Sequence, residues 1–231
     1  IQMGYADVIV SGGAESVMSP VGMAGFQNMT ALSSSGKSMP FDRDRDGFMM
    51  TEGSATLILE EMGSAKARGA RIYGEILGSG SNADAHHITA PSPGGHGAAR
   101  CMQLAIEDAG LTSNEICYVN AHGTSTPLND AAEAQALSKV FGEHGPPVTS
   151  TKGVTGHALG AAGAIEATSV LISFQRRQIP PTAGFTNPDP EIPNINLVTG
   201  SPQDWAPGPS MSNSFGFGGH NGCLILAPVT A

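Results

Sequence analysis

The chain contains few aromatic residues, few basic residues and little cysteine, and each shortage excludes a class of protein. Aromatic residues make up 5% of the 231 residues while Gly 31 and Pro 16 are abundant, which predicts a globular core packed mainly with small aliphatic side chains. Lys and Arg total 11 against 20 Asp and Glu, so the net charge of −9 argues against nucleic acid or an anionic membrane as partner. Because no apolar run approaches membrane-spanning length, we expect a cytoplasmic protein.

The cysteines carry no pattern of a metal site or of a nucleophile. Cys101, Cys117 and Cys223 are an odd number of thiols without metal-type spacing, which fits a reducing compartment. Cys101 falls about one turn inside an expected helix, and the other two fall in strand-like runs. We therefore expect all of them to be inert and structural.

Apolar patterns predict strands and helices in alternation. A continuous apolar run at 7–10, ended by glycines, is typical of a strand buried on both faces. Asp130 and Glu133 form a capping-box-like start for a helix. The expected strands are 7–10, 55–59, 72–77, 116–119, 195–198 and 223–226, and the expected helices are 62–68, 98–109, 130–141 and 157–177. This order predicts a layered α/β fold with a largely buried sheet.

Two histidines lie just past strand-like runs, among glycines and threonines. They are His122, within the segment 120–127, and His157, within 151–157. A neutral imidazole donates a hydrogen bond and titrates near working pH, so two converging rings would hold an enolate oxygen. Lys152 would tune the pair electrostatically, and the glycine-rich turn 215–219 would offer a backbone N–H to a second oxyanion. The pair therefore predicts one active site.

Other motifs are weaker. Residues 42–47 match the start of an EF-hand loop, but Gly53 stands at the glutamate position and Glu52 comes one residue early, so we expect internal ion pairing or a solvated turn. The pair Gly216 and Gly218 lacks the third glycine of a dinucleotide fingerprint, since Asn221 occupies that place. Zinc-type spacing is missing from the remaining histidines, which are His86, His87, His96, His144 and His220.

A set of these motifs, in this order, resembles one family. The matching segments are 11–15, 40–48, 120–127, 151–152, 155–163 and 213–219. Together they resemble the β-ketoacyl-acyl-carrier-protein synthases, the condensing enzymes of fatty-acid elongation, and specifically the synthase II type. The resemblance implies a thiolase-like fold with two similar halves in αβαβα layers. It also implies a homodimer and a partner carrier protein whose phosphopantetheine holds acyl and malonyl groups, without nucleic acid or membrane.

The resemblance also implies roles for individual residues. The catalytic set would be His122, His157, Lys152 and Phe217: the histidines stabilise the enolate, the lysine organises them, and Phe217 offers its N–H to the acyl oxyanion and its ring as a gate. Thr124 and Thr126 would bind the pantetheine arm. Phe215, Gly218 and Gly219 would line the acyl site. No cofactor is required, and a structural monovalent cation would be held by Asn120, Glu166, Ser212 and Asn213.

The family's nucleophilic cysteine is missing from these residues. In the family it lies at a helix N-terminus just before the region that matches this chain, so we expect the chain to be a C-terminal portion, incomplete at its N-terminus and inactive alone. Residues 1–71 would end the first half and 72–231 would form the second. A second hypothesis stays open, that of a silent ketosynthase-like partner that binds carrier or sets chain length. Six arginines are candidates for docking an acidic carrier, namely Arg43, Arg45, Arg68, Arg71, Arg176 and Arg177.

Overall fold

A mixed five-stranded sheet lies at the centre of the structure. The computed structural model describes residues 1–229, and its central strands are ordered β3–β9–β8–β4–β5. Their bounds are β3 Glu75–Ala83, β9 His220–Ala227, β8 Ser210–Gly216, β4 Tyr118–Asn120 and β5 Val148–Thr149. Strand β4 runs parallel to β5 and β8, whereas β9 is antiparallel to both of its neighbours. The carboxyl end of β4 leads directly into the segment that contains His122.

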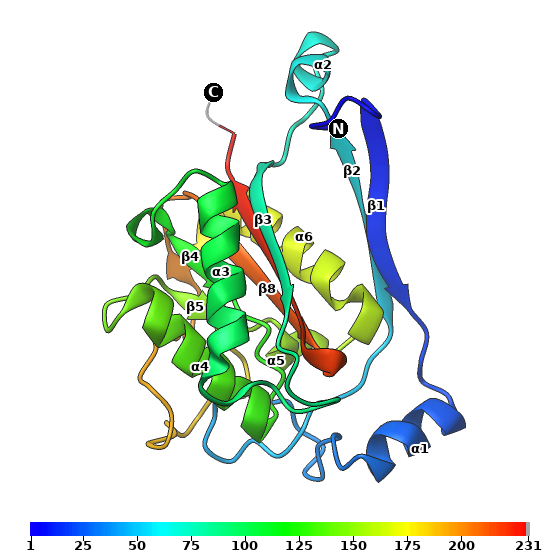
Figure 1. Cartoon of the computed structure of the whole chain (residues 1–231), viewed down its shortest axis with the longest axis vertical. Helices are drawn as coiled ribbons and strands as arrows, with labels where there is room; N and C mark the ends of the chain where they lie inside the picture. Colours follow the sequence, from blue (N-terminus) through cyan, green and yellow to red (C-terminus); the bar gives the residue numbers. More distant parts are fainter. Residues whose placement is uncertain (230–231) are drawn as a thin grey trace.

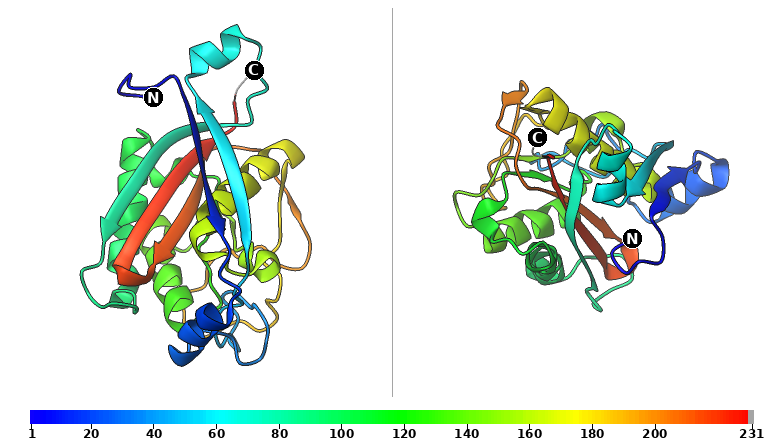
Figure 2. Two further views of the ribbon diagram at one scale, coloured as in Figure 1. Left: turned by 90° about the vertical axis from the view of Figure 1, so that its right-hand side faces the viewer. Right: turned by 90° about the horizontal axis from the view of Figure 1, so that it is seen from above.

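Helices cover both faces of this sheet. Helices α3 (His96–Asp108) and α4 (Pro127–Phe141) lie on one face, and α6 (Ala162–Arg176) lies on the other (Figure 1). An antiparallel pair, β1 (Val8–Glu15) and β2 (Gly53–Glu60), packs on the far side of α6 (Figure 2). The layers are therefore helix, sheet, helix and sheet, in agreement with the predicted layered α/β class.

Glycine lets the helix layer approach the sheet closely. A Cβ at Gly78 of β3 would lie 2.4 Å from the Ala109 nitrogen, and one at Gly80 would lie 2.3 Å from the Cys101 carbonyl oxygen. The core between them contains small side chains such as Ala98, Ala105 and Cys101. This arrangement confirms the prediction, made from composition, that backbones pack closely.

Shorter elements connect the layers. They are α1 Pro20–Asn28, α2 Met62–Ala67, α5 Lys152–Thr155, β6 Gln178–Ile179 and β7 Gln203–Asp204, with 3-10 turns at Pro93–Gly95, Ser113–Glu115, Leu159–Ala161 and Phe217–Gly219. Across the described part of the chain, no helix combines the length and the apolar character needed to cross a bilayer.

Several predicted elements differ from those observed. Strand β1 is longer than expected and is not buried, since the exposed fractions of Val8 and Val10 are 49% and 69%. Only β2 pairs with it among residues 1–229, so its apolar run has an open edge. The strand expected at 72–77 lies at 75–83, where Gly78 and Gly80 allow α3 to pack against it. Residues 195–198 form only an isolated bridge, between Val148 and Leu197.

Two helix starts were also placed wrongly, and several elements were missed, among them β8, α1 and the short elements α5, β5, β6 and β7. Helix α4 begins at Pro127 with Thr126 as its N-cap, not at Asp130. Helix α6 begins at Ala162, because Leu159 has a left-handed φ of 40° that interrupts the helix expected from residue 157. Strand β8 escaped prediction because its serines and asparagine read as polar, and helix α1 was not expected at all.

Candidate functional site

Two carboxylates of helix α4 hold the turn that carries His122. Glu133 accepts hydrogen bonds from the backbone nitrogens of His122 (2.9 Å) and Gly123 (2.7 Å). Asp130 accepts from those of Thr124 (2.9 Å) and Ser125 (3.1 Å). Both carboxylates are buried, and burial raises the pKa of Glu133 to about 7, an effect that the donated N–H groups oppose. Four consecutive amides are thus fixed by two side chains one helical turn apart.

The backbone on either side of His157 is held by a segment distant in sequence. The His157 nitrogen donates to the Met49 carbonyl at 2.7 Å, and its carbonyl accepts from the Thr51 nitrogen at 3.1 Å. The ring packs edge-on against Phe48, with 5.1 Å between centroids. Residues 48–51 therefore set the position of this histidine, although the sequence motif around it does not include them.

These two turns bring the histidine rings together and place Lys152 beside them. The ring centroids of His122 and His157 are 5.2 Å apart, with 83° between planes. Lys152 Nζ lies 3.2 Å from His122 Nδ1, donates to the His122 carbonyl at 2.7 Å, and forms an ion pair with Glu166 of α6. The structure thus assembles the predicted trio in one place and adds Glu166 as the counter-ion of the lysine.

The hydrogen bonds determine which ring nitrogen of each histidine carries the proton. The ammonium of Lys152 can only donate, so His122 Nδ1 accepts. His157 Nδ1 accepts the backbone N–H of Leu159 at 3.2 Å. In a neutral ring the proton then sits on Nε2 in both residues, which leaves one Nε2–H on each for an external oxygen.

Burial keeps both rings neutral. His122 is only 4% exposed, and burial, followed by the nearby charge of Lys152, lowers its pKa well below the usual range. The same causes, burial first, lower the pKa of His157 to about 3. At neutral pH the site therefore contains two uncharged hydrogen-bond donors, as the sequence predicted.

The glycine-rich turn after β8 lies close to the pair. The ring centroid of Phe215 is 5.8 Å from that of His122. The side chain of Phe217 is 44% exposed, and its ring centroid lies 6.4 Å from that of Phe26 in α1. Gly218 and Gly219 have left-handed φ values of 81° and 75°, and the Gly218 nitrogen already donates to the Ile88 carbonyl at 2.7 Å. The oxyanion-binding role of this turn stays a prediction.

Thr124 and Thr126 lie at the entrance to helix α4. Their hydroxyl oxygens are 2.8 Å apart, and Thr126 also caps the helix by accepting from the Asn129 nitrogen at 3.4 Å. Thr124 is buried and Thr126 is half-buried, so Thr126 is the more accessible of the two. Their binding of a pantetheine arm stays a prediction.

The predicted cation ligands divide between the two faces of the sheet. Asn120 and Ser212 are cross-strand partners, and their side chains point toward α6, which contributes Glu166. Buried oxygens without a hydrogen-bond partner include Asn120 Oδ1 and Glu166 Oε2, and such acceptors fit a monovalent cation. The side chain of Asn213 lies on the opposite face, where its Nδ2 donates to Glu133 at 3.1 Å and its Oδ1 is also without a partner, so its part in a cation site stays a prediction.

The cysteines and the EF-hand-like segment have structural surroundings. Cys101 and Cys223 are buried in the core, and Cys117 is half-buried. Asp42, the first residue of the segment 42–47, accepts from the backbone nitrogens of Thr186 and Asn187. Internal ion pairing at this segment, one of the two expected outcomes, is confirmed for Arg45, which pairs with Asp189 at 2.5 Å.

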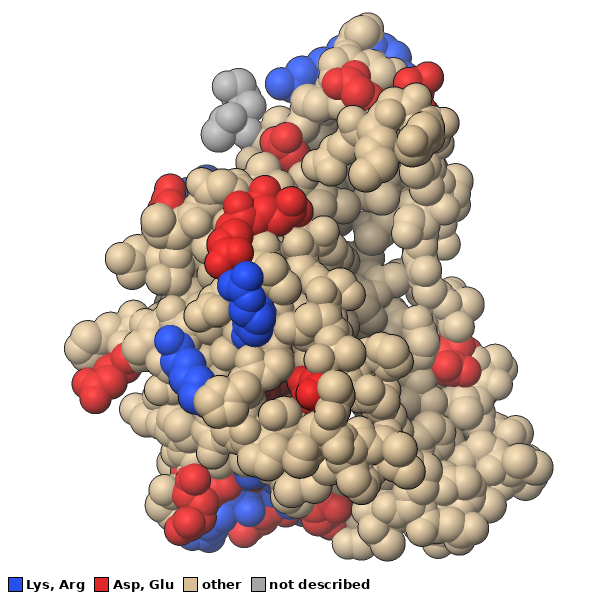
Figure 3. Space-filling model, viewed as in Figure 1, with Lys and Arg blue, Asp and Glu red and all other residues tan. Residues whose placement is uncertain are grey.

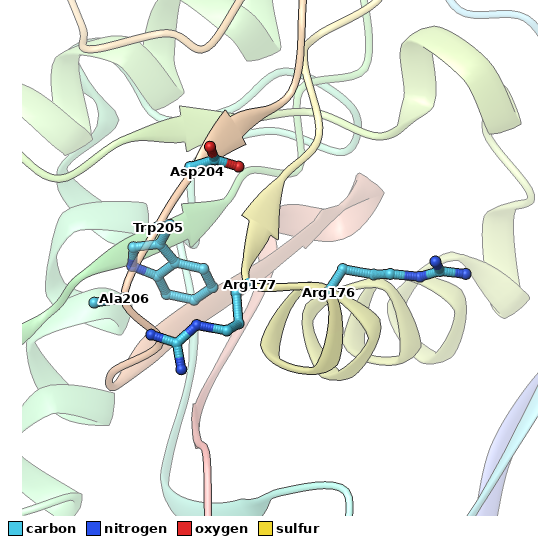
Figure 4. Close-up of a pocket in the computed structure, with 5 residues that line it drawn as sticks. All are labelled: Arg176, Arg177, Asp204, Trp205 and Ala206. Atoms are coloured by element: carbon cyan, nitrogen blue, oxygen red, sulfur yellow. The ribbon is translucent and has the colours of Figure 1, made fainter.

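Neither histidine of the pair, nor Lys152, lines the surface cavity at the end of α6. A shallow cavity of about 450 Å³ is lined by Arg176, Arg177, Asp204, Trp205 and Ala206. Figure 4 shows the Arg177 side chain beside the indole and that of Arg176 directed away from it. On the face in Figure 3, acidic and basic side chains are interspersed and neither forms a broad field. Arg45 is buried, so this one of the six candidates cannot dock a carrier.

Sequence reasoning missed the residues that position the histidines. Asp130 and Glu133 were interpreted as a helix cap, although both lie inside α4 and bind the preceding turn. The signal was a pair of acidic residues three positions apart on an otherwise small and apolar helix. Phe48 ends the segment 40–48 that contributed to the resemblance, but nothing in that segment indicated its contact with His157, and Phe26 carried no signal.

Comparison with known proteins shows two adjoining matches to one family. Residues 1–65 match the family model "Beta-ketoacyl synthase, N-terminal domain" and residues 73–186 match "Beta-ketoacyl synthase, C-terminal domain". The chain is 47% identical over 233 residues to 3-oxoacyl-[acyl-carrier-protein] synthase 2 of Synechocystis, with 98% of this chain and 56% of that protein covered. It is 45% identical over 232 residues to the Staphylococcus aureus enzyme of the same name, with 98% and 57% covered.

Solved structures agree in fold. A β-ketoacyl synthase of Burkholderia phymatum superposes with a TM-score of 0.95 at 43% identity, covering 99% of this chain and 56% of that one. A type II polyketide ketosynthase, solved in complex with its acyl-carrier protein, gives a TM-score of 0.95 at 33% identity, covering 100% and 58%. The chain therefore spans about half the length of the relatives that it matches.

Proposed function

The chain belongs to the β-ketoacyl synthase family, as a homologue of the type 2 3-oxoacyl-[acyl-carrier-protein] synthases, and from this we propose that it supplies the enolate-stabilising part of a decarboxylative Claisen condensation. The substrates are malonyl-acyl carrier protein and an acyl thioester, in fatty-acid chain elongation. The observation that carries the proposal is the pair of buried neutral imidazoles, each with a free Nε2–H, beside the buried ammonium of Lys152.

The first step breaks the bond between the malonyl carboxylate and its α-carbon. CO₂ departs, and the electron pair left on the α-carbon delocalises onto the thioester oxygen, which becomes an enolate oxygen. The Nε2–H groups of His122 and His157 donate to that oxygen, and their pre-set orientation makes these bonds strongest when the charge develops. A neutral donor is needed because the rings must not trap the enolate by protonating it, and burial keeps them neutral.

The second step joins the enolate carbon to the carbonyl carbon of the acyl thioester, and the sulfur that held the acyl group leaves as a thiolate. We propose that this sulfur belongs to a cysteine outside the 231 residues, because Cys101 and Cys223 are buried in the core and Cys117 lies in a desolvated setting that raises its pKa. The N–H of Phe217 would contribute to the oxyanion hole of this step, with Phe215, Gly218 and Gly219 shaping the site.

Partners and ions follow from the same proposal. The donor and acceptor groups would arrive on an acyl carrier protein, whose pantetheine arm Thr124 and Thr126 would bind, in a homodimer in the cytoplasm. A monovalent cation, where bound, would be held by Asn120, Ser212 and Glu166, and would satisfy the buried oxygens of Asn120 and Glu166 that have no hydrogen-bond partner. The reaction needs no other cofactor.

A catalytically silent partner subunit is the second candidate. A solved "ketosynthase/chain length factor" is similar to the chain at 37% identity with a TM-score of 0.94, so this fold also occurs in assemblies of that kind. The retained histidine pair with its lysine favours the condensing enzyme, since a silent subunit has no enolate to stabilise.

Release of CO₂ distinguishes the two. The protein at its natural length, given malonyl carrier labelled in the free carboxyl group, should release labelled CO₂, and His157→Ala should suppress this release by about 100-fold. His144→Ala, at an exposed position, serves as the control. Binding of the carrier without CO₂ release, or an unimpaired His157→Ala variant, would contradict the proposed role.

Condensation itself provides a second readout. With acyl carrier protein also present, the protein at its natural length should form ketoacyl product, detectable by mass spectrometry. The 231 residues alone should form none. Product from these residues alone would show that one of the three cysteines is a nucleophile after all.

A further inference from the structure

Residues Ser38 and Met39 lie outside both histidine motifs but hydrogen-bond to both of them. The Ser38 hydroxyl donates to the Lys152 carbonyl at 2.7 Å. The Met39 nitrogen donates to Ser125 Oγ at 2.8 Å. One dipeptide therefore connects the turn that carries Lys152 and His157 to the turn that follows His122.

The bond from Ser38 acts on the backbone from which the Lys152 side chain extends. Lys152 opens α5, a helix of a single turn, and its carbonyl also accepts from the Gly156 nitrogen at 3.1 Å. A single isolated helical turn has little stability of its own because its nucleation is unfavourable. The hydroxyl of Ser38 is a second donor to the same carbonyl, so it helps to fix the point from which Nζ reaches His122 and Glu166.

The bond from Met39 acts on a residue in an unfavourable conformation. Ser125 has a φ of 69°, in the left-handed region that a residue with a Cβ seldom adopts. Three bonds keep it there: its nitrogen donates to Asp130, its carbonyl accepts from the Gly47 nitrogen, and its hydroxyl accepts from Met39. Met39 thereby stabilises the turn between His122 and helix α4.

Two glycines allow these segments to stack without side chains between them. A Cβ at Gly153 would lie 2.2 Å from the Ala183 carbonyl oxygen, and a Cβ at Gly184 would lie 2.2 Å from the Ser38 carbonyl oxygen. The backbone at 183–184 therefore packs against both the Lys152 turn and Ser38. A Cβ at either glycine would push this backbone away from its neighbour.

From these contacts we propose that Ser38 is a positioning residue for Lys152, and that the dipeptide Ser38–Met39 fixes the two histidine turns relative to each other. The inference rests on the proposed function, because the value of a fixed spacing lies in holding both Nε2–H groups on one developing enolate oxygen. Gly153 and Gly184 contribute because, without side chains, they let the backbone at 183–184 pack closely against the Lys152 turn and Ser38. The Ser38 hydroxyl bonds to the Lys152 backbone and to neither histidine ring.

The test uses the protein at its natural length with Ser38→Ala, Ser38→Thr and the control Ser34→Ala. Ser34 is an exposed serine of the same segment whose hydroxyl bonds only to Asp46. Removing the Ser38 hydroxyl should lower kcat for CO₂ release from malonyl carrier by about 5- to 20-fold with KM unchanged, because a positioning defect weakens the transition state and not carrier binding. Ser38→Thr keeps the hydroxyl and should restore the rate.

Hydrogen exchange supplies a readout that does not depend on activity. In Ser38→Ala, peptides spanning 120–127 and 151–157 should exchange about threefold faster or more, while Ser34→Ala leaves both unchanged. Should Ser38→Ala not fold, Gly153→Ala, whose Cβ displaces the Ala183 backbone, should give the same pattern. Unchanged exchange and kcat in the folded variant would overturn the proposal. Absence of CO₂ release by the wild type would overturn the proposed function, while exchange would still decide the role of Ser38.

Discussion

Lys152 contacts His122 at two atoms, the ring Nδ1 at 3.2 Å and the backbone carbonyl at 2.7 Å. A single ammonium thus fixes both the tautomer of the ring and the backbone from which the ring projects. Glu166 holds that ammonium in turn, so the orientation of the histidine depends on a buried ion pair between two separate elements.

Breaking this ion pair should be costly. Lys152→Met leaves the Glu166 carboxylate buried without its partner, and we expect the free energy of unfolding to fall by about 3–5 kcal/mol, measured by urea denaturation. Arg100→Met, which breaks an exposed pair with Glu107, is the matched control and should cost less than about 1 kcal/mol. Equal losses of unfolding free energy in the two variants would show that the buried ion pair contributes no more to stability than an exposed one.

Acidification should destabilise the fold through the buried histidines. The pKa of His157 is about 3 in the folded protein against an ordinary value of 6.5, so between these values the unfolded chain binds more protons. Stability is then full above pH 6.5 and falls as the pH drops toward 3, by less than about 1.4 kcal/mol per pH unit from this residue.

The comparison that isolates this effect is His157→Gln against the exposed His144→Gln. Urea midpoints between pH 7 and pH 4 should depend less on pH in His157→Gln than in the wild type, and His144→Gln should behave as the wild type does. A wild-type pH slope in His157→Gln would mean that the ring is already protonated in the fold.

Removal of the Glu133 carboxylate should loosen the His122 turn. Glu133→Ala leaves the amides of His122 and Gly123 and the Nδ2 of Asn213 without acceptors, and we expect a loss of about 3 kcal/mol or more in unfolding free energy. Glu143→Ala, at an exposed position, should change stability by less than about 0.5 kcal/mol. A loss for Glu133→Ala as small as the control's would mean that water replaces the carboxylate.

A monovalent cation should stabilise the protein through the unpartnered oxygens near Lys152. Replacing choline chloride with potassium chloride at equal ionic strength should raise the Tm by a few degrees, about 2–4 °C. Asn120→Ala removes one orphaned oxygen and should abolish the increment. Asn187→Ala, whose amide bonds to Asp44 at the surface, is the control. An increment that persists in Asn120→Ala would place the ion elsewhere.

The chemistry of the site could be predicted from the sequence further than its architecture could. His122 and His157 stood in motifs whose composition pointed to one centre, and the structure brings their rings to 5.2 Å. The positioning residues could not be predicted, because Ser38 and Phe48 act across the fold and have no local pattern. Asp130 illustrates the difficulty: a helix-start signal and a buried acceptor for a neighbouring turn look the same in one dimension.

How well each strand could be predicted from the sequence depended on what packs against it in the fold. Strand β2 was located correctly from its apolar run, but it is only partly buried, since Ile58 is 67% exposed. Strand β8 consists largely of serine and asparagine and therefore carried no apolar signal. Strand β3 extends beyond its predicted end, where Gly78 and Gly80 let helix α3 approach the sheet. Contacts between elements distant in sequence determine the bounds of these strands, and such contacts cannot be read from a single sequence.

The two carboxylates of α4 also fix the number of residues in the turn that carries His122. Each carboxylate accepts from two consecutive amides, so the four amides from His122 to Ser125 match two acceptors that lie one helical turn apart. A substitution in this turn leaves the number of amides unchanged, although Gly123 has no room for a Cβ, which would lie 2.5 Å from the Ser150 Cβ, and Ser125 uses its hydroxyl to hold a left-handed φ. An inserted or deleted residue would move every following amide away from its carboxylate acceptor. The turn therefore requires a fixed number of residues.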